Sequence, residues 1–299
     1  MQGRAHPGEG AFTIVGCAGR LLPCLMDTEL QLPPPGTVER WAYDYVTTDV
    51  LAAKLAPGPV PAEWAESSAG LWVPERPGRP EGFTAAQRGP KTPGRDALRV
   101  PERRAGLLHT FLHHELQAAE LMCWAILAFP QTPRAFRKGL LGICQDEIRH
   151  MAMYGEHIAA LGFEVGSFPV NDWFWQRVPA ARTAAEFVAV MGLGFEGANL
   201  DHTQRFAARF RAVGDVEGAR LQELVGQEEI PHVAFGAHWF AKLQGPLTFD
   251  SWQAALPAPL SPLLMRGRPL NRPARQQAGY PLTFLQELER WEPSDAPSS

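Results

Sequence analysis

The chain has 299 residues, of which 45% are hydrophobic and 20% are charged, and its formal net charge is -4 at pH 7. This composition allows a large buried core and excludes a strongly basic surface, so nucleic acid is not an expected partner. Four scattered cysteines, Cys17, Cys24, Cys123 and Cys144, argue against a disulfide framework and for reduced thiols in the cytoplasm.

Prolines divide the chain into regions. Half of the 28 prolines lie in residues 1–101 and only five lie in residues 102–244, so the long helices are expected in the middle. We expect residues 1–101 to form an N-terminal extension with one helix at about 37–55 and an irregular, Pro-rich wrap after it. The apolar stretch at 12–26 is interrupted by glycine, arginine and proline, so we expect it to form neither a signal peptide nor a membrane span.

Residues 102–243 predict four helices of about 28 residues each, with start and stop signals at their ends. Pro130 ends the first helix, Thr132 is the expected N-cap of the second, and Thr183 opens the third as part of a capping box. Asp215 starts the fourth. The expected ranges are 102–129, 132–161, 183–214 and 215–245.

The lengths of the connections predict how these helices pack. Short turns near Gln131 and Gly214 join antiparallel pairs, whereas about 20 residues, 163–182, separate the second helix from the third and allow a crossover. The predicted fold class is therefore all-α, a ferritin-like four-helix bundle with a long crossover. Residues 244–299 are expected to form a C-terminal tail that packs on the bundle.

A repeated motif indicates the function. Residues 144–150 read CQDEIRH and residues 226–232 read GQEEIPH, so the second and fourth helices both carry an acidic residue followed by Glu-x-x-His. Glu115 precedes Glu147 by 32 residues, and Glu196 precedes Glu229 by 33. The two halves therefore place equivalent glutamates at the same level of the predicted bundle.

Residues three apart share one face of a helix, so each Glu-x-x-His presents a carboxylate and an imidazole together. Four carboxylates in an apolar core repel one another and lose hydration, and bound cations compensate both costs. One Glu from each of two helices, with a Glu-x-x-His from each of the others, is the ligand pattern of dimetal carboxylate proteins. We expect two metal ions, iron above all, with manganese or a mixed iron–manganese pair compatible. The predicted ligands are Glu115, Glu147, His150, Glu196, Glu229 and His232.

Several other residues are candidates for supporting roles. Asp146 and Glu228 precede the ligand glutamates and can accept the outer N–H of the histidine on the opposite helix, or can be solvated charges. Tyr154, Asn199 and Thr203 lie on inward faces, either near the metals and substrate or as ordinary core residues. Glu120 and Asp201 follow Glu115 and Glu196 by five residues, about 140° round the helix, and are excluded as ligands.

Two further features have competing interpretations. Arg266, Arg268, Arg272 and Arg275 either recognise a phosphate or carboxylate or pin the tail to the bundle by salt bridges, and the second interpretation is favoured. Pro231 lies inside the fourth helix between Glu229 and His232, where it removes a backbone donor and predicts a kink.

Taken together, LLHTFLHHELQAAEL, CQDEIRHMAMY, GDVEGARLQELVGQEEIPHVAFGAHWF and RPLNRPARQQAGY resemble the bacterial family called domain of unknown function 455, from about residue 40 to 285. The resemblance implies a ferritin-like fold and metal ligands at the positions named above, but no reaction. More distantly, the two Glu-x-x-His motifs are similar to the metal-binding motifs of bacterioferritin, rubrerythrin and the di-iron tRNA hydroxylases.

Three functions compete at this point. The favoured one is an oxygen-activating di-iron oxidoreductase, a hydroxylase or oxidase, that acts on a small organic substrate with dioxygen and an unidentified electron donor. The second is a metal-handling or peroxide-scavenging protein of the ferritin or rubrerythrin kind, and the third is a non-catalytic metal-binding scaffold. A cytoplasmic monomer or homodimer with no membrane partner is expected.

Overall fold

A computed structural model describes residues 32–65, 72–83, 92–94 and 96–293. Within these ranges the protein is all-α, and an isolated bridge between Thr37 and Glu63 is the only paired extended backbone. No helix in the described ranges is both long enough and apolar enough to span a membrane. The predictions for Cys17, Cys24 and residues 12–26 concern residues outside this description.

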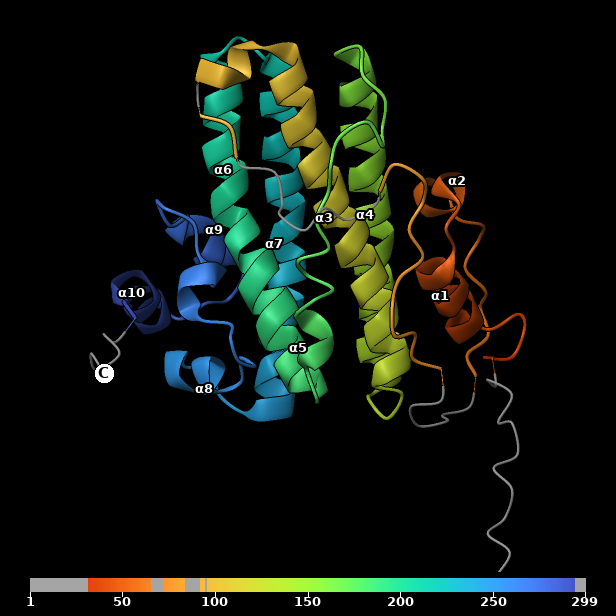
Figure 1. The fold of residues 1–299 in the computed structure, drawn as a ribbon. Helices are drawn as coiled ribbons and strands as arrows, with labels where there is room; N and C mark the ends of the chain where they lie inside the picture. Colours follow the sequence, from red (N-terminus) through yellow and green to blue (C-terminus); the bar gives the residue numbers. More distant parts are fainter. Residues whose placement is uncertain (1–31, 66–71, 84–91, 95, 294–299) are drawn as a thin grey trace, which may run out of the picture. The chain divides into compact units, whose positions relative to one another are not determined.

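The long helical segments lie side by side (Figure 1). The first two, α3 and α4, pack along each other, α6 packs along α7, and contacts between α4 and α7 join the two pairs. The segments are α3 (Pro101–Ala128), α4 (Arg134–Ala160), the run α5 (Ala184–Val190), π-helical η3 (Met191–Phe195) and α6 (Glu196–Ala212), and α7 (Val216–Gln244).

Local capping chemistry fixes the ends of these helices. The Thr183 hydroxyl accepts a hydrogen bond from the backbone N–H three residues later at 3.1 Å and caps α5, and Asp215 caps α7 in the same way at 2.9 Å. Gly214, in the turn before α7, has φ 82°, a left-handed conformation that glycine adopts without strain. Helix α4 begins at Arg134 with Pro133 as its cap, one residue later than the sequence predicted.

The single helix predicted at about 37–55 is in fact two helices, α1 (Val38–Thr47) and α2 (Leu51–Leu55). Between them Thr48 is extended, with ψ 140°, and its hydroxyl accepts a hydrogen bond from the backbone N–H of Val50 at 3.2 Å. This local side-chain bond competes with helical hydrogen bonding, which explains the break. A short 3-10 helix, η1 (Asp96–Arg99), leads into α3.

The segments outside the four long runs pack on them with short helices. The connection from α4 to α5 contains one 3-10 turn, η2 (Val178–Ala180). After α7, η4 packs on η3 and α6, and α9 packs on α6 and α7. These C-terminal elements are α8 (Phe249–Ala254), η4 (Pro262–Met265), α9 (Arg272–Gln277) and α10 (Leu282–Arg290).

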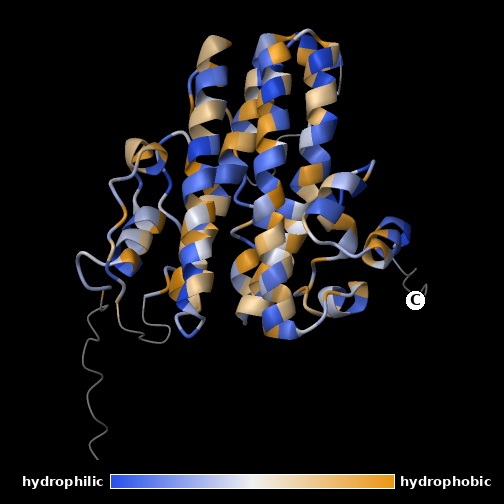
Figure 2. Ribbon diagram, turned by 180° about the vertical axis from the view of Figure 1, so that it is seen from behind, coloured by the Kyte–Doolittle hydropathy of each residue, from blue (hydrophilic) through white to orange (hydrophobic). Residues whose placement is uncertain are grey.

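Hydrophobic side chains form two clusters at different levels of the long helices. The first cluster contains buried hydrophobic residues from the ranges 118–127 of α3 and 136–144 of α4. The second contains those from the ranges 107–116 of α3 and 151–158 of α4. On α4, the stretch between the two clusters contains Glu147 and His150. Hydrophilic residues alternate with hydrophobic ones along the long helices (Figure 2). The predicted ligand layer therefore lies between two apolar layers.

Candidate metal centre

The long helices bring all six predicted ligands into the interior. Helices α3 and α6 each contribute one glutamate, and α4 and α7 each contribute a Glu-x-x-His pair. Every one of these side chains is at most 4% exposed. They are Glu115 on α3, Glu147 and His150 on α4, Glu196 at the start of α6, and Glu229 and His232 on α7.

Four of these residues lie close enough together to hold a metal ion. Glu115, Glu147, His150 and Glu229 each offer one ligand atom, and the four atoms lie within 4.8 Å of one another. Within this group, Nδ1 of His150 lies 3.3 Å from a carboxylate oxygen of Glu147. Donors gathered at this spacing surround a point that one cation can occupy.

The other two predicted ligands lie beside this group. His232 directs Nδ1 at a carboxylate oxygen of Glu147 and at one of Glu229, both at 3.1 Å. Glu196 borders Glu229, and its Oε1 is buried without a hydrogen-bond donor among the described residues. An orphaned buried carboxylate oxygen is costly unless a cation or water satisfies it, so this atom fits a metal-binding role.

The outer nitrogens of the two histidines bond across the α4–α7 contact. Nε2 of His150 lies 2.8 Å from Glu228 on α7, and Nε2 of His232 lies 3.1 Å from Asp146 on α4. Arg149 then bridges these two carboxylates, at 2.7 Å from Glu228 and 2.9 Å from Asp146. An outer carboxylate fixes the ring orientation and leaves Nδ1 as the inward, metal-directed atom.

Burial and mutual repulsion perturb the ionisation of the cluster. Burial, reinforced by the charge of Glu147, raises the pKa of Glu115 well above its usual value, and burial with the charge of Glu229 does the same for the pKa of Glu196. Burial also opposes ionisation of Glu147, yet hydrogen bonds with the two histidines hold its pKa below the usual value. Without cations, the carboxylates and imidazoles therefore share protons, which metal ions replace on binding.

Three inward-facing candidates have different partners. Asn199 donates its amide N–H to Glu229 at 3.0 Å and so restrains a predicted ligand. The Tyr154 hydroxyl accepts a hydrogen bond from Gln222 at 2.8 Å, while its ring lines a cavity beside the cluster. Thr203 bonds back to the carbonyl of Asn199 within its own helix at 2.9 Å, so its hydroxyl is used in the α6 backbone.

The segment that precedes Glu196 is π-helical, which the sequence analysis did not predict. A Cβ on Gly192 of η3 would lie only 2.9 Å from Cα of Gly236 on α7, so the two backbones touch at this point. The hydroxyl of Tyr280, from the C-terminal segment, donates to the carbonyl of Leu193 inside η3. A π-helical turn changes the register of the residues that follow it, and here it leads directly into a predicted ligand.

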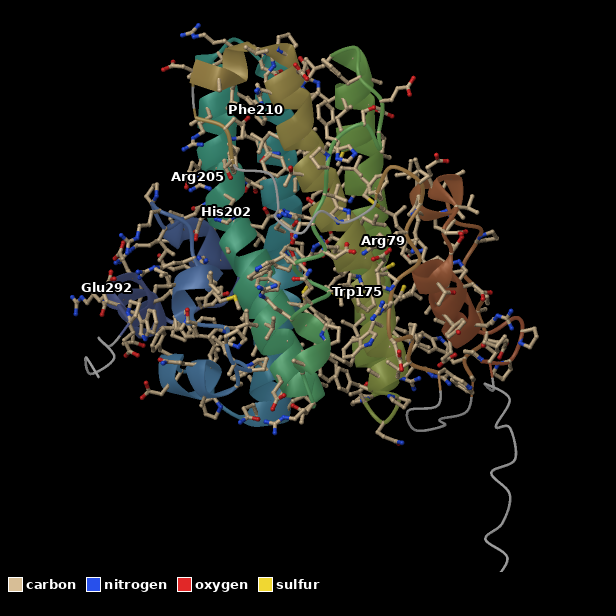
Figure 3. All side chains as sticks on the ribbon, viewed as in Figure 1. Arg79, Trp175, His202, Arg205, Phe210 and Glu292 are labelled. Atoms are coloured by element: carbon tan, nitrogen blue, oxygen red, sulfur yellow. The ribbon has the colours of Figure 1, made fainter. Side chains whose placement is uncertain are left out.

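Glu120 does not face the metal centre but holds the N-terminal segment and the α4–α5 connection on α3. Its carboxylate accepts hydrogen bonds from Nζ of Lys54, from the Arg79 guanidinium and from Nε1 of Trp175, each at 2.7 Å. Figure 3 labels Arg79 and Trp175 beside the α3–α4 pair. The sequence excluded Glu120 as a ligand, but the spacing carried no information about these distant partners.

Asp201 has the corresponding role for the C-terminal segment. Arg275 of α9 forms a buried salt bridge with it at 2.8 Å, and the backbone N–H groups of Gly267 and Asn271 donate to it at 2.7 Å each. Glu120 and Asp201 therefore occupy equivalent positions in the two halves, and each anchors one of the segments that flank the long helices.

The arginine-rich segment is occupied by internal contacts. Arg266 donates to backbone carbonyls near the end of α10, and Arg268 pairs with Glu292 at 3.0 Å. Arg272 pairs with a glutamate of α10, and Arg275 binds Asp201 as described. Glu292 lies at the edge of this group (Figure 3). These contacts match the salt-bridge interpretation rather than a phosphate site.

A cavity of about 290 Å³ adjoins the metal centre between α3 and α6. Glu115 and Glu196 line its inner end, and His114 and His202 lie in its wall. Burial lowers the pKa of His114 to about 3 and that of His202 to about 4, so both imidazoles are neutral at pH 7. The aromatic residues of the wall are Phe111, Tyr154, Trp173, Phe174 and Phe195.

The roles of Arg149 and Gln222 were not predicted from the sequence. Arg149 lies three residues after Asp146 and one before His150, so its spacing on α4 was an available signal for a role beside the histidine. Gln222 bonds Tyr154 across the helix contact, and no spacing within α7 could have indicated this pairing.

The fold and the site together define an all-α protein with a buried glutamate and histidine cluster able to hold a metal ion. Residues 42–286 match the family described as "Protein of unknown function (DUF455)", and the chain belongs to this family. It is 25% identical over 218 residues to an uncharacterized protein of Haemophilus influenzae, a match that covers 67% of this chain and 74% of that protein. No solved structure matches the chain.

Proposed function

We propose that the chain is a ferritin-like four-helix protein that binds two metal ions, iron above all, and uses dioxygen to oxidise a small organic substrate. The observation that carries this proposal is the inward cluster of four carboxylates and two imidazoles that borders an aromatic cavity. Four carboxylates balance the charge of two divalent ions, so a dimetal centre leaves no net charge in the apolar core.

Each half of the cluster supplies a matched set of donors. His150 and His232 present Nδ1 to the interior, and Glu228 and Asp146 hold their outer nitrogens. Asn199 restrains Glu229 through its amide. These contacts preorganise the donors before metal binds, which lowers the cost of assembling the site.

Two ferrous ions held by these six residues would supply two of the electrons that reduce dioxygen, and oxidation of the substrate would supply the other two. The protein binds the substrate and shields it from water. The cavity places a substrate against Glu115 and Glu196, the two ligands from α3 and α6. Its aromatic wall excludes water from the reacting groups. Carboxylate and imidazole donors also suit manganese, so the donor set alone does not separate the two metals.

Anaerobic titration of the metal-free protein with Fe²⁺ tests this proposal. We expect two irons per chain, followed on exposure to air by oxygen uptake and a transient near-ultraviolet and visible absorption. Protein that binds no transition metal under these conditions contradicts the dimetal proposal. Binding without oxygen uptake leaves the metal site but contradicts the oxidoreductase.

A metal-storage protein of the ferritin kind is the alternative to exclude. Shell assembly needs free faces on the long helices, whereas η4 and α9 cover part of α6 and α7. The sequence also contains no Cys-x-x-Cys pair for a rubredoxin-like iron site. Light scattering that gives a monomer or dimer mass, with iron uptake that stops at two per chain, distinguishes the oxidoreductase from a storage shell.

A further inference from the structure

The cavity beside the metal centre has the size of a small-molecule site. Its volume is about 290 Å³, roughly twice that of an engineered 150 Å³ protein cavity that holds benzene. Its inner end is formed by Glu115 and Glu196, so a bound molecule lies against two predicted metal ligands. The site therefore has room for about ten to fifteen non-hydrogen atoms.

Flat aromatic surfaces dominate the wall. The rings of Phe174 and Phe195 stack with centroids 4.6 Å apart, and the His114 ring stacks on Phe174 at 5.0 Å. Trp173 packs against Phe195 at 5.2 Å, which fixes the orientation of this wall. A rigid aromatic wall favours a flat ring that can lie parallel or edge-on to it.

Charge sets the second requirement. Among the residues that the structure describes, no lysine or arginine lines the cavity, so an anionic ligand finds no fixed side-chain cation there. The guanidinium of Arg205, three residues after His202, lies outside the lining and over the Phe206 ring, 4.9 Å from the ring centroid, and Figure 3 shows Arg205 next to His202 on α6. Four carboxylates and two divalent metals cancel, which leaves no net charge to attract an anion or a cation.

We propose that this cavity binds a neutral, largely apolar molecule that contains a flat one- or two-ring system. The inference rests on the proposed function for the reaction and for the charge balance of the metal site, whereas the cavity size and the aromatic wall hold with or without oxygen chemistry. Besides Glu115 and Glu196, the polar side chains of the wall are those of His114, Tyr154, Asn199 and His202, and one of them can orient one polar group of such a molecule.

Three probes of similar size with the same ring system and different charge test the inference by calorimetry on the full-length protein loaded with Mn²⁺. These are 2-naphthalenemethanol, 2-naphthoate and 2-naphthylmethylammonium. We expect the neutral alcohol to bind at least tenfold more tightly than either ion. Equal or tighter binding of the carboxylate or the ammonium, or no binding of the alcohol, overturns the inference.

Variants then locate the bound probe. Ala198→Phe fills the cavity and should abolish binding of the alcohol, whereas Ala208→Phe, on the exposed side of the same helix, should leave it unchanged. If Ala198→Phe does not fold by circular dichroism, Phe174→Ala, which removes one face of the wall, decides instead and should weaken binding at least fivefold. Unchanged binding in the folded cavity variant overturns the inference.

The outcomes also separate this inference from the proposed function. Probe binding without oxygen uptake by the iron-loaded protein rejects the oxidoreductase and keeps the cavity assignment. Two bound irons and oxygen uptake, with no preference for the neutral probe, reject the cavity assignment and keep the oxidoreductase.

Discussion

At the scale of single residues, the side chains of two adjacent glutamates on α7 point in opposite directions and have different roles. Glu229 points into the cluster, whereas Glu228 points outward to Nε2 of His150 and to Arg149. We predict that Glu229→Gln loses at least one of two metal ions per chain. Glu228→Gln should keep both ions but bind them about 10- to 100-fold more weakly, because it loses only the carboxylate that orients the imidazole.

Metal stoichiometry and competition titrations measure both effects. Glu223→Gln provides the control, because Glu223 lies on the same helix and pairs with Arg211 at an exposed position. If Glu228→Gln abolishes binding as completely as Glu229→Gln, the distinction between ligand and orienting carboxylate is wrong.

A second residue-scale prediction concerns acid stability. The backbone N–H of Gly166 donates to Nε2 of His109 at 2.8 Å, so this buried imidazole must be unprotonated. Burial, with the nearby His113, lowers the pKa of His109 to about 4, against about 6.5 when unfolded. The unfolded chain therefore binds the proton first as pH falls, and stability is lost between about pH 6.5 and 4, by up to about 3 kcal/mol.

The variant His109→Gln keeps a side-chain acceptor for Gly166 but does not titrate. We expect urea denaturation of this variant to show a smaller fall in unfolding free energy between pH 7 and 4.5 than the parent chain. An identical fall in both proteins would assign the acid sensitivity to other groups.

At the scale of helices, the predictable and unpredictable parts of the site separate clearly. Glu147 with His150 could be paired from sequence because both lie on one face of one helix, and equal spacings placed Glu115 at the same level. The π-helical turn before Glu196 could not be predicted, because it depends on contact between Gly192 and Gly236 in different helices. Periodicity describes a regular helix and contains no signal for a register change made by tertiary packing.

The same contact yields a prediction for α5, η3 and α7. Gly192→Ala places a methyl group within 2.9 Å of the Gly236 Cα, so the helices must separate. We expect a loss of about 1–3 kcal/mol in unfolding free energy and a lower metal occupancy, because Glu196 follows directly.

Gly142→Ala is the matched control, since Gly142 is an exposed residue of α4 and a Cβ there meets nothing within 4 Å. It should stabilise the protein by about 0.5–1 kcal/mol and leave metal binding intact. Thermal melts and metal analysis distinguish the two variants. Similar behaviour of both would show that the close approach at Gly192 does not position the ligand.

At the scale of the whole described chain, sequence predicted an all-α protein, which the structure confirms. The packing of the segments at either side of the long helices was harder to predict from the sequence, because buried ion pairs between distant residues hold these segments in place. Lys54 and Arg79 bind Glu120, and Arg275 binds Asp201. Their sequence separations, 66, 41 and 74 residues, are set by the fold and by no local pattern.

The Asp201–Arg275 pair tests how strongly the C-terminal segment is joined to α6. Both side chains are fully buried, so Asp201→Asn leaves a guanidinium without its counterion and should cost about 3–5 kcal/mol of unfolding free energy. In the double variant Asp201→Asn/Arg275→Met no charge is stranded, and the loss should be smaller than the sum of the two single losses. Arg272 lies on the same helix α9 as Arg275 and forms an exposed pair with Glu289 of α10, so Arg272→Met should cost less than about 1 kcal/mol. Urea denaturation measures all four variants, and strictly additive losses for Asp201 and Arg275 would mean that the pair does not couple the segment to the long helices.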